Sequence, residues 1–275
     1  MIDTHCHLTF PDFCGRIADQ LAEGARLGVT GFITISTTTH DCLEALALAK
    51  EYRNVWCTSG IHPLHSHEGE DGAPGGTHNW SNLRAVASDP SGKCVAWGEL
   101  GLDNHYKTPA AAHQRAVLDE QLAFIESCRR GDGSRPPIDL PIVIHCREAF
   151  DDLIPILKRT SLDPTRFVFH CFTGTVADAR EVLDFGASIS FTGVATYKSA
   201  AEVREAARLV PPDRIMVETD APFLSPEPHR GSRPCRPAWV RHVAEAIAAA
   251  RGVGFGEFHE QVNQNTERFF GVPAR

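Results

Sequence analysis

Short apolar segments rich in β-branched residues recur along this chain and alternate with stretches whose apolar positions follow helical spacing. Segments of this length and composition are typical of buried strands. We predict eight strands, at residues 1–7, 28–36, 54–62, 93–103, 140–146, 166–172, 187–193 and 214–220.

The segments between these strands predict helices. Residues 113–130 carry apolar side chains at helical spacing, Pro237 stands where a first helical turn tolerates proline, and the last helix should end at Gly271. Eight strand–helix units predict an α/β fold, a (β/α)8 TIM barrel, with residues 1–275 forming one domain. A doubly wound open sheet is the alternative, but no glycine-rich dinucleotide fingerprint follows a strand.

Two segments look like insertions into this pattern. Residues 66–80 are rich in glycine, histidine and acids, and residues 129–141 are rich in proline and glycine. We expect both to be loops of the same domain rather than domain boundaries.

Composition narrows the class of protein further. The formal net charge is −8 and the nine cysteines form no CxxC pair. An acidic chain is unlike a protein that binds duplex DNA through a broadly basic surface. Scattered cysteines indicate free thiols in a reducing compartment. With no basic leader and no run of about 18 apolar residues, we expect a cytoplasmic protein without a membrane segment.

Unusual polar residues stand where the predicted strands end. In a parallel barrel the carboxyl ends of all strands meet at one rim, which is where active sites form. Residues in a strand point to alternate faces, so His5 and His7 project the same way and could hold one ion. The full set at strand ends is His5, His7, His62, Glu99, Asp103, His145, His170, Glu218 and Asp220.

Taken singly, His62, His145 and His170 could each be a hydrogen-bonded structural histidine. Together with Glu99 and Asp220 they favour a site for two metal ions. A carboxylate such as Glu99 has two oxygens and can bridge two cations. Two divalent ions about 3.5–4 Å apart stabilise the attacking and leaving oxygens of a phosphoryl displacement.

Six motifs occur in a characteristic order. They are DTHCHL at 3–8, GIHP at 60–63, GELGLD at 98–103, PIVIHCREA at 141–149, FHCFTG at 169–174 and ETDAPFL at 218–224, and PHRG follows at 228–231. In these motifs the chain resembles the TatD-type metal-dependent deoxyribonucleases, which belong to the amidohydrolase-like barrels. The resemblance extends over essentially the whole chain.

The resemblance implies a role for each site residue. It implies that His5, His7 and Asp220 bind a first metal, that Glu99 bridges, that His145 and His170 bind a second metal, that His62 contacts the scissile phosphate and that Asp220 also acts as general base. It implies a 3′→5′ exonuclease acting on DNA, on single strands or 3′ ends, or on RNA. Mg²⁺ or Mn²⁺ is the expected working ion, although the histidines would also suit bound Zn²⁺.

The loop that follows PHRG differs from the family pattern, which commonly continues with Asn-Glu-Pro. Here it reads SRPCRP, and the loop HRGSRPCR, at 229–236, brings Arg230, Arg233 and Arg236 near the same rim. Arginine offers a planar fork suited to phosphate oxygens, so we expect these three residues to bind the DNA strand. Phe223 and Tyr197 could stack a base, although core packing is the alternative for Phe223.

Three other interpretations stay open. A D-aminoacyl-tRNA deacylase would use the same residues, because a metal site that hydrolyses phosphodiesters can also hydrolyse esters. Amidases, lactonases and phosphotriesterases of the same superfamily often bridge their metals with a carboxylated lysine, but Lys93 precedes the fourth strand and Lys107 lies beyond it. A non-catalytic metal or nucleic-acid binding protein is disfavoured, since structural zinc sites are closed and mononuclear. No obligate protein partner is expected.

Overall fold

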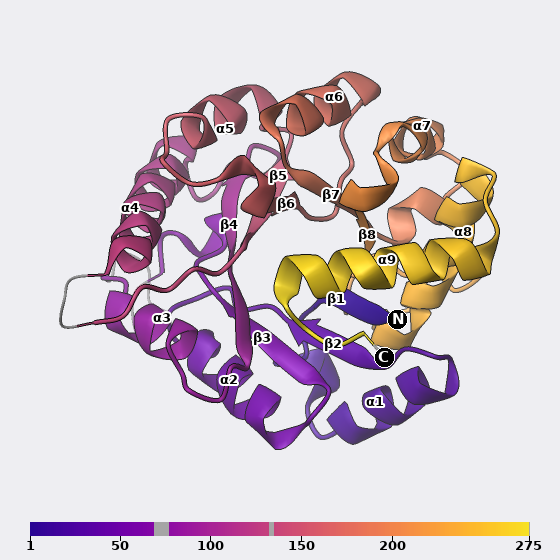
Figure 1. Cartoon of the computed structure of the whole chain (residues 1–275), viewed down its shortest axis with the longest axis horizontal. Helices are drawn as coiled ribbons and strands as arrows, with labels where there is room; N and C mark the ends of the chain where they lie inside the picture. Colours follow the sequence, from indigo (N-terminus) through magenta and orange to yellow (C-terminus); the bar gives the residue numbers. More distant parts are fainter. Residues whose placement is uncertain (69–76, 132–134, 275) are drawn as a thin grey trace.

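Parallel strands form a barrel in the computed structural model, which describes residues 1–68, 77–131 and 135–274 (Figure 1). The strands pair in chain order, so each lies beside its neighbours in sequence. Every strand falls within one of the predicted segments, apart from a one-residue extension of the fifth, and the predicted TIM barrel is confirmed. Their bounds are β1 (Ile2–Cys6), β2 (Gly31–Thr34), β3 (Val55–Ser59), β4 (Cys94–Asp103), β5 (Ile142–Arg147), β6 (Phe167–Phe169), β7 (Ser188–Phe191) and β8 (Ile215–Val217).

The barrel closes between its first and last strands. Cys6 forms a parallel bridge with Ala221, and the His7 amide donates to the Ala221 carbonyl at 2.7 Å. The buried Asp3 carboxylate accepts the Thr219 amide at 2.9 Å. This seam places the first and last sequence motifs side by side, although more than 200 residues separate them.

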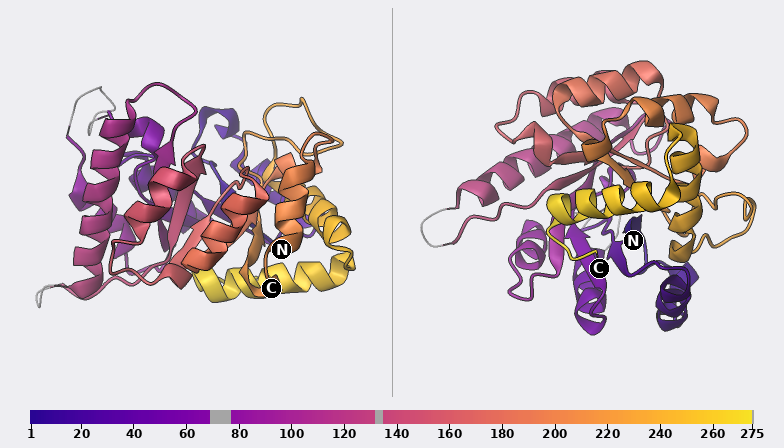
Figure 2. Two further views of the ribbon diagram at one scale, coloured as in Figure 1. Left: turned by 90° about the horizontal axis from the view of Figure 1, so that it is seen from above. Right: turned by 45° about the vertical axis from the view of Figure 1, so that its right-hand side comes forward.

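Helices surround the barrel on its outside (Figures 1 and 2). The predicted helix at Pro237 starts with a 3₁₀ turn at Pro237–Trp239 and continues as α8, and the last helix ends before Gly271, as predicted. None of the helices in the described ranges has the length and apolar character needed to cross a bilayer. The bounds are α1 (Ile17–Arg26), α2 (Asp41–Glu51), α3 (Trp80–Ala87), α4 (Ala111–Arg130), α5 (Phe150–Leu157), α6 (Val176–Phe185), α7 (Ala201–Leu209), α8 (Val240–Arg251) and α9 (Phe255–Phe270).

The C-terminal helix closes the amino end of the barrel. In the left view of Figure 2, α9 runs along the lower edge of the molecule, where both termini lie. Phe269, Phe270 and Val272 pack in one apolar cluster with barrel residues such as Ile33 and Met216. Since apolar side chains fill this end, the carboxyl end is where a polar cavity can form.

The two predicted insertions lie only partly within the described residues. Residues 69–76 of the segment 66–80 and residues 132–134 of the segment 129–141 fall outside them. In the described parts, α3 begins at Trp80 and α4 ends at Arg130.

Close contact between β4 and β5 requires a glycine at position 101. Gly101 pairs with His145 and has a φ of +150°, and a Cβ there would lie 1.9 Å from the His145 carbonyl oxygen. We therefore expect Gly101→Ala to lower the free energy of unfolding by about 2–3 kcal/mol through overpacking and backbone strain. Denaturant unfolding checks this. Gly256→Ala, at an open position in α9, is the control and should be neutral or stabilising. Equal stability of both variants would show that β5 can move away from the added methyl group without loss of stability.

Candidate metal centre

The first strand brings two histidines to the carboxyl end of the barrel. His5 and His7 are almost completely buried, with exposed fractions of 0% and 3%. Their Nε2 atoms lie 3.6 and 3.3 Å from Oδ1 of Asp220, which follows β8 at the seam. Asp220 has a φ of +59°, a conformation that non-glycine residues seldom adopt and that is often found at functional sites. The structure therefore brings together His5, His7 and Asp220, the predicted ligands of the first metal.

Glu99 lies at the centre of the site, on β4, with 2% of its side chain exposed. Burial alone would raise the pKa of Glu99, but the surrounding histidines, foremost His62, hold that pKa well below its usual range. Glu99 is therefore an anion within a ring of histidines. Five ring nitrogens lie within 4 Å of its oxygens, at 2.8 Å (His170), 3.5 Å (His145), 3.7 Å (His5), 3.7 Å (His7) and 3.9 Å (His62).

Two further acids contact His145 and His170 at the ring nitrogens that do not face Glu99. Oδ2 of Asp103 lies 3.0 Å from His145 Nε2, and Oε1 of Glu218 lies 3.4 Å from His170 Nδ1. The Cys171 amide also donates to Glu218 Oε1, at 2.6 Å. Carboxylates that accept the second ring N–H of a ligating histidine orient its ring and raise its basicity. This pattern is typical of histidines that bind metal.

The position of Glu218 leads to a prediction about metal affinity. Glu218→Gln keeps the size of the side chain but removes the charge that faces His170 Nδ1. We expect metal to bind about 10- to 100-fold more weakly, with an unchanged fold. Competition against a chromophoric chelator measures the affinity, and Glu202→Gln on the exposed face of α7 is the control. Equal affinity in the two variants would exclude a role for Glu218 in orienting His170.

In His62 a backbone amide, that of Leu64, determines which ring nitrogen carries the proton. Its Nδ1 accepts the Leu64 amide at 3.0 Å, so the neutral ring carries its proton on Nε2. Nε2 faces His145 Nδ1 at 3.1 Å. Burial lowers the pKa of His62 well below its usual value, which keeps the ring neutral. The ring is suited to donate a hydrogen bond into the cavity.

The donor set matches what a divalent metal requires. His5 Nε2 is buried and has no hydrogen-bond partner among the described residues, although oxygens of Asp220 and Glu99 lie 3.6 and 3.7 Å away. Metal–ligand bonds of about 2.0–2.2 Å place neighbouring ligand atoms of one ion roughly 3 Å apart. Within the described residues, three groups of side chains have their donor atoms within 4.8 Å of one another: His5, Glu99 and His170; His5, His7 and Asp220; and His62, Glu99 and His145.

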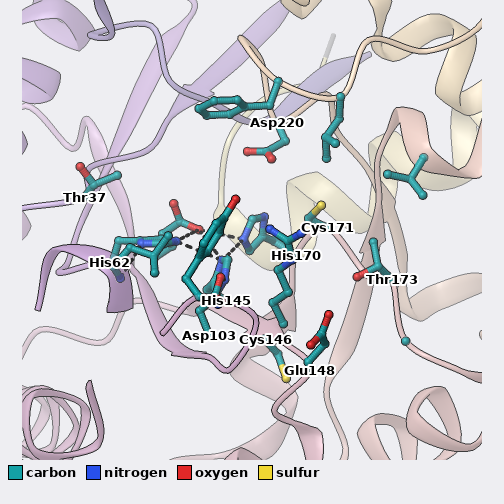
Figure 3. Close-up of a pocket in the computed structure, with 18 of the residues that line it drawn as sticks. Thr37, His62, Asp103, His145, Cys146, Glu148, His170, Cys171, Thr173 and Asp220 are labelled. Atoms are coloured by element: carbon teal, nitrogen blue, oxygen red, sulfur yellow. Dashed lines mark hydrogen bonds and ion pairs between the residues drawn. The ribbon is translucent and has the colours of Figure 1, made fainter. Parts of the chain in front are cut away.

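These residues form the floor of a cavity of about 850 Å³ at the carboxyl end of the barrel (Figure 3). Figure 3 shows Asp220 on one side of the histidines and Asp103 on the other. The volume lies within the range of sites that bind small molecules or parts of larger substrates. The walls above the floor include Phe10, Thr37, Tyr106, Arg147, Thr173 and Phe223.

The three predicted strand-binding arginines do not line this cavity. Arg236 forms an ion pair with Glu23 of α1 at 2.9 Å, so it is turned away from the metal centre. Arg230 lies over the ring of Tyr197, which also lies outside the cavity wall. Arg233 forms an ion pair with Asp12 at 3.7 Å, and its guanidinium lies 5.2 Å from the ring centre of Phe223, which lines the cavity. The loop folds against α1, and this contact partner cannot be read from the loop sequence.

The sequence places Asp103 and Glu218 at the rim through their positions at strand ends, but it indicates no role for them. Their contacts with His145 and His170 suit them to orient these two rings. Tyr106 and Arg147 were missed altogether. A single tyrosine in a loop carries no signal until the loop is seen to border the cavity.

Comparison with known proteins agrees with this geometry. A family model described as TatD related DNase matches residues 2–271. The uncharacterized metal-dependent hydrolase YcfH of Escherichia coli K12 is 34% identical over 277 residues, covering 100% of this chain and 97% of that protein. The 3′-5′ ssDNA/RNA exonuclease TatD of Enterobacter lignolyticus is 32% identical, covering 99% of both chains.

A solved structure is similar over the same extent. The crystal structure of YJJV, a TatD homologue from Escherichia coli K12, matches with a TM-score of 0.86 and 30% sequence identity. The match covers 99% of this chain and 98% of that one.

Proposed function

Because the chain belongs to the family of TatD-related DNases, which are metal-dependent hydrolases, we propose that it removes nucleotides from the 3′ end of single-stranded DNA. The observation that carries the proposal is Glu99, a buried carboxylate within 4 Å of five histidines at the floor of an open cavity. The family resemblance expected from the six motifs is confirmed by the match over residues 2–271.

We assign the residues to two ligand sets. His5, His7 and Asp220, which lie together, would hold one divalent ion, His145 and His170 would hold a second, and Glu99 is close to both sets. When bound, such ions lower the pKa of water and stabilise negative charge on phosphoryl oxygens. Mg²⁺ or Mn²⁺ is proposed as the working ion, and Zn²⁺ as an ion that the histidines could retain on purification.

Asp220 and His62 would act on the substrate directly. The Asp220 side chain is 15% exposed, against 2% for Glu99, so it reaches the cavity. It can accept the proton of the attacking water at a carboxylate oxygen. His62 Nε2–H can donate to a non-bridging oxygen of the scissile phosphate, where negative charge increases in the transition state.

Several features support a nucleic-acid end as substrate. Relatives that share at least 30% identity over the full length are named as exonucleases acting on single-stranded DNA and RNA. Among the described residues of the cavity wall there is no lysine, which disfavours the carboxylated-lysine type of metal bridge. DNA, with RNA as a related substrate, is therefore the proposed partner.

The test uses metal-stripped protein and single-stranded oligonucleotides labelled at the 3′ or the 5′ end. Mg²⁺, Mn²⁺ or Zn²⁺ is added back separately. Stepwise shortening of the 5′-labelled strand supports the proposal and identifies the working ion. No cleavage with any ion would contradict it, and the same samples would then be tested on D-aminoacyl-tRNA and on simple esters and amides.

A further inference from the structure

Exposed aromatic rings concentrate at the mouth of the metal-binding cavity. Among the residues that the structure describes, the exposed large hydrophobic side chains are Leu43, Tyr106 and Phe223, at 41%, 49% and 36%. Tyr106 and Phe223 both line the cavity, whereas Leu43 lies on α2 away from it. Isolated exposed apolar side chains are ordinary, but two aromatic rings at one cavity mouth indicate a ligand with flat apolar faces.

The two rings stand on opposite sides of the cavity. Tyr106 follows the end of β4 and Phe223 follows β8, and these strands are four positions apart in the ring of strands. Each ring lies three residues beyond an acid of the site, Asp103 or Asp220. Figure 3 shows these two acids on opposite sides of the histidines.

The backbone amide of each of the two aromatic residues is hydrogen-bonded to an acid of the site. The Tyr106 amide donates to Oδ1 of Asp103 at 3.2 Å, while Oδ2 of the same carboxylate contacts His145. The Phe223 amide donates to the Asp220 carbonyl at 2.9 Å. The backbone positions of Tyr106 and Phe223 are therefore linked directly to the two acids of the site.

An arginine guanidinium lies over the face of each of the two rings. The Arg147 guanidinium lies 5.2 Å from the Tyr106 ring centre, and the Arg233 guanidinium lies 5.2 Å from the Phe223 ring centre. Arg147 lines the cavity, and Arg233 also forms an ion pair with Asp12 at 3.7 Å. An aromatic face beside a cation is the combination that proteins use for the bases and phosphates of single strands.

We propose that Tyr106 and Phe223 stack on unpaired bases on the two sides of the scissile phosphodiester, with Arg147 and Arg233 beside the flanking phosphates. This inference rests on the proposed nuclease function and adds the residues that recognise the strand. Stacking accepts any base, because every base has a π-face. A base inside a duplex has both faces covered by its neighbours, so this pair of rings would select unpaired ends.

Binding of oligonucleotides that contain 2-aminopurine tests the proposal, since stacking on an aromatic ring quenches this base analogue. The analogue is placed at the last or the second-last 3′ nucleotide, and Asp220→Asn protein is used because its slow turnover leaves the strand intact during the measurement. Combining Tyr106→Ala with Asp220→Asn should abolish the quenching at one of the two positions and raise the Kd about 5- to 100-fold. Tyr106→Phe in the same parent protein should retain both the quenching and the affinity. Leu43→Ala, an equally exposed side chain remote from the cavity, is the matched control.

A strand that lacks only the base at the position where Tyr106→Ala abolishes quenching separates stacking from other effects. The parent protein should bind it as weakly as Tyr106→Ala binds the normal strand, and Tyr106→Ala should bind both strands equally. Phe223→Leu should behave in the same way at the other position, with metal content measured because Phe223 packs near His7.

Either of two results would overturn the stacking proposal: no quenching of 2-aminopurine by the parent protein, or the same Kd for Tyr106→Ala and Leu43→Ala. Failure of the nuclease function is observed separately, as absence of cleavage by the wild-type protein with metal.

Discussion

Glu99→Gln is expected to lower kcat/KM on a 3′ single-stranded DNA end by about 10³-fold or more, because it removes the carboxylate that lies within 4 Å of all five site histidines. Glutamine has nearly the same size, so the cavity keeps its shape. It replaces one carboxylate oxygen by an NH₂ group, which cannot bind a cation. His170 Nε2, at 2.8 Å, and His145 Nδ1, at 3.5 Å, then lose their negative partner on this side, while Glu218 and Asp103 still face the other nitrogen of each ring.

Two measurements on Glu99→Gln separate the bridging role from a general structural one. Elemental analysis should show a loss of bound metal, while denaturant unfolding of the metal-free proteins should show similar stability. Glu205→Gln, an exposed acid on α7, is the matched control and should keep wild-type activity. Wild-type turnover by Glu99→Gln on every substrate tried would exclude Glu99 as the shared ligand.

Asp220→Asn is expected to reduce kcat by about 10²- to 10⁴-fold, because a neutral amide cannot accept the proton of the attacking water. KM should change little if the strand is held by other groups, as expected when an interaction made in the transition state is removed. The variant also loses a ligand charge beside His5 and His7, so metal affinity must be measured in parallel.

Single-turnover rates at saturating metal distinguish the two roles of Asp220. A rate that stays low when metal occupancy is complete supports the general-base role. A rate that recovers with added metal would show that Asp220 serves only as a ligand. Asp151→Asn, an exposed acid in the first turn of α5, serves as the control.

The clustering of the candidate metal-binding residues could be predicted because its signal is local. His5 and His7 share a face of β1 through the alternation of a strand, and Glu99 belongs to β4 itself. His62, His170 and Asp220 lie one to three residues beyond the observed strand ends, where the chain turns out of the barrel. The rule that parallel strands meet at one rim was enough to place them together.

The surroundings of the centre were predicted less well because they depend on partners distant in sequence. The arginines after β8 looked like a phosphate-binding group, but Arg236 is paired with Glu23, more than 200 residues away. The contacts of Asp103 with His145 and of Glu218 with His170 appear only once β4 is seen beside β5 and the end of β8 is seen close to the end of β6. Tyr106 carried no signal, because nothing in its neighbourhood marks a loop as the wall of a cavity.

By itself, therefore, the sequence determined the barrel, the family and the residues at the carboxyl rim, because strand periodicity and strand order suffice to bring these groups together. Only the tertiary structure decided which nitrogen of His62 faces the cavity, which arginines reach its edge and which aromatic rings flank it. Those properties depend on side-chain orientation and on contacts between loops, and no periodic pattern in the chain encodes them.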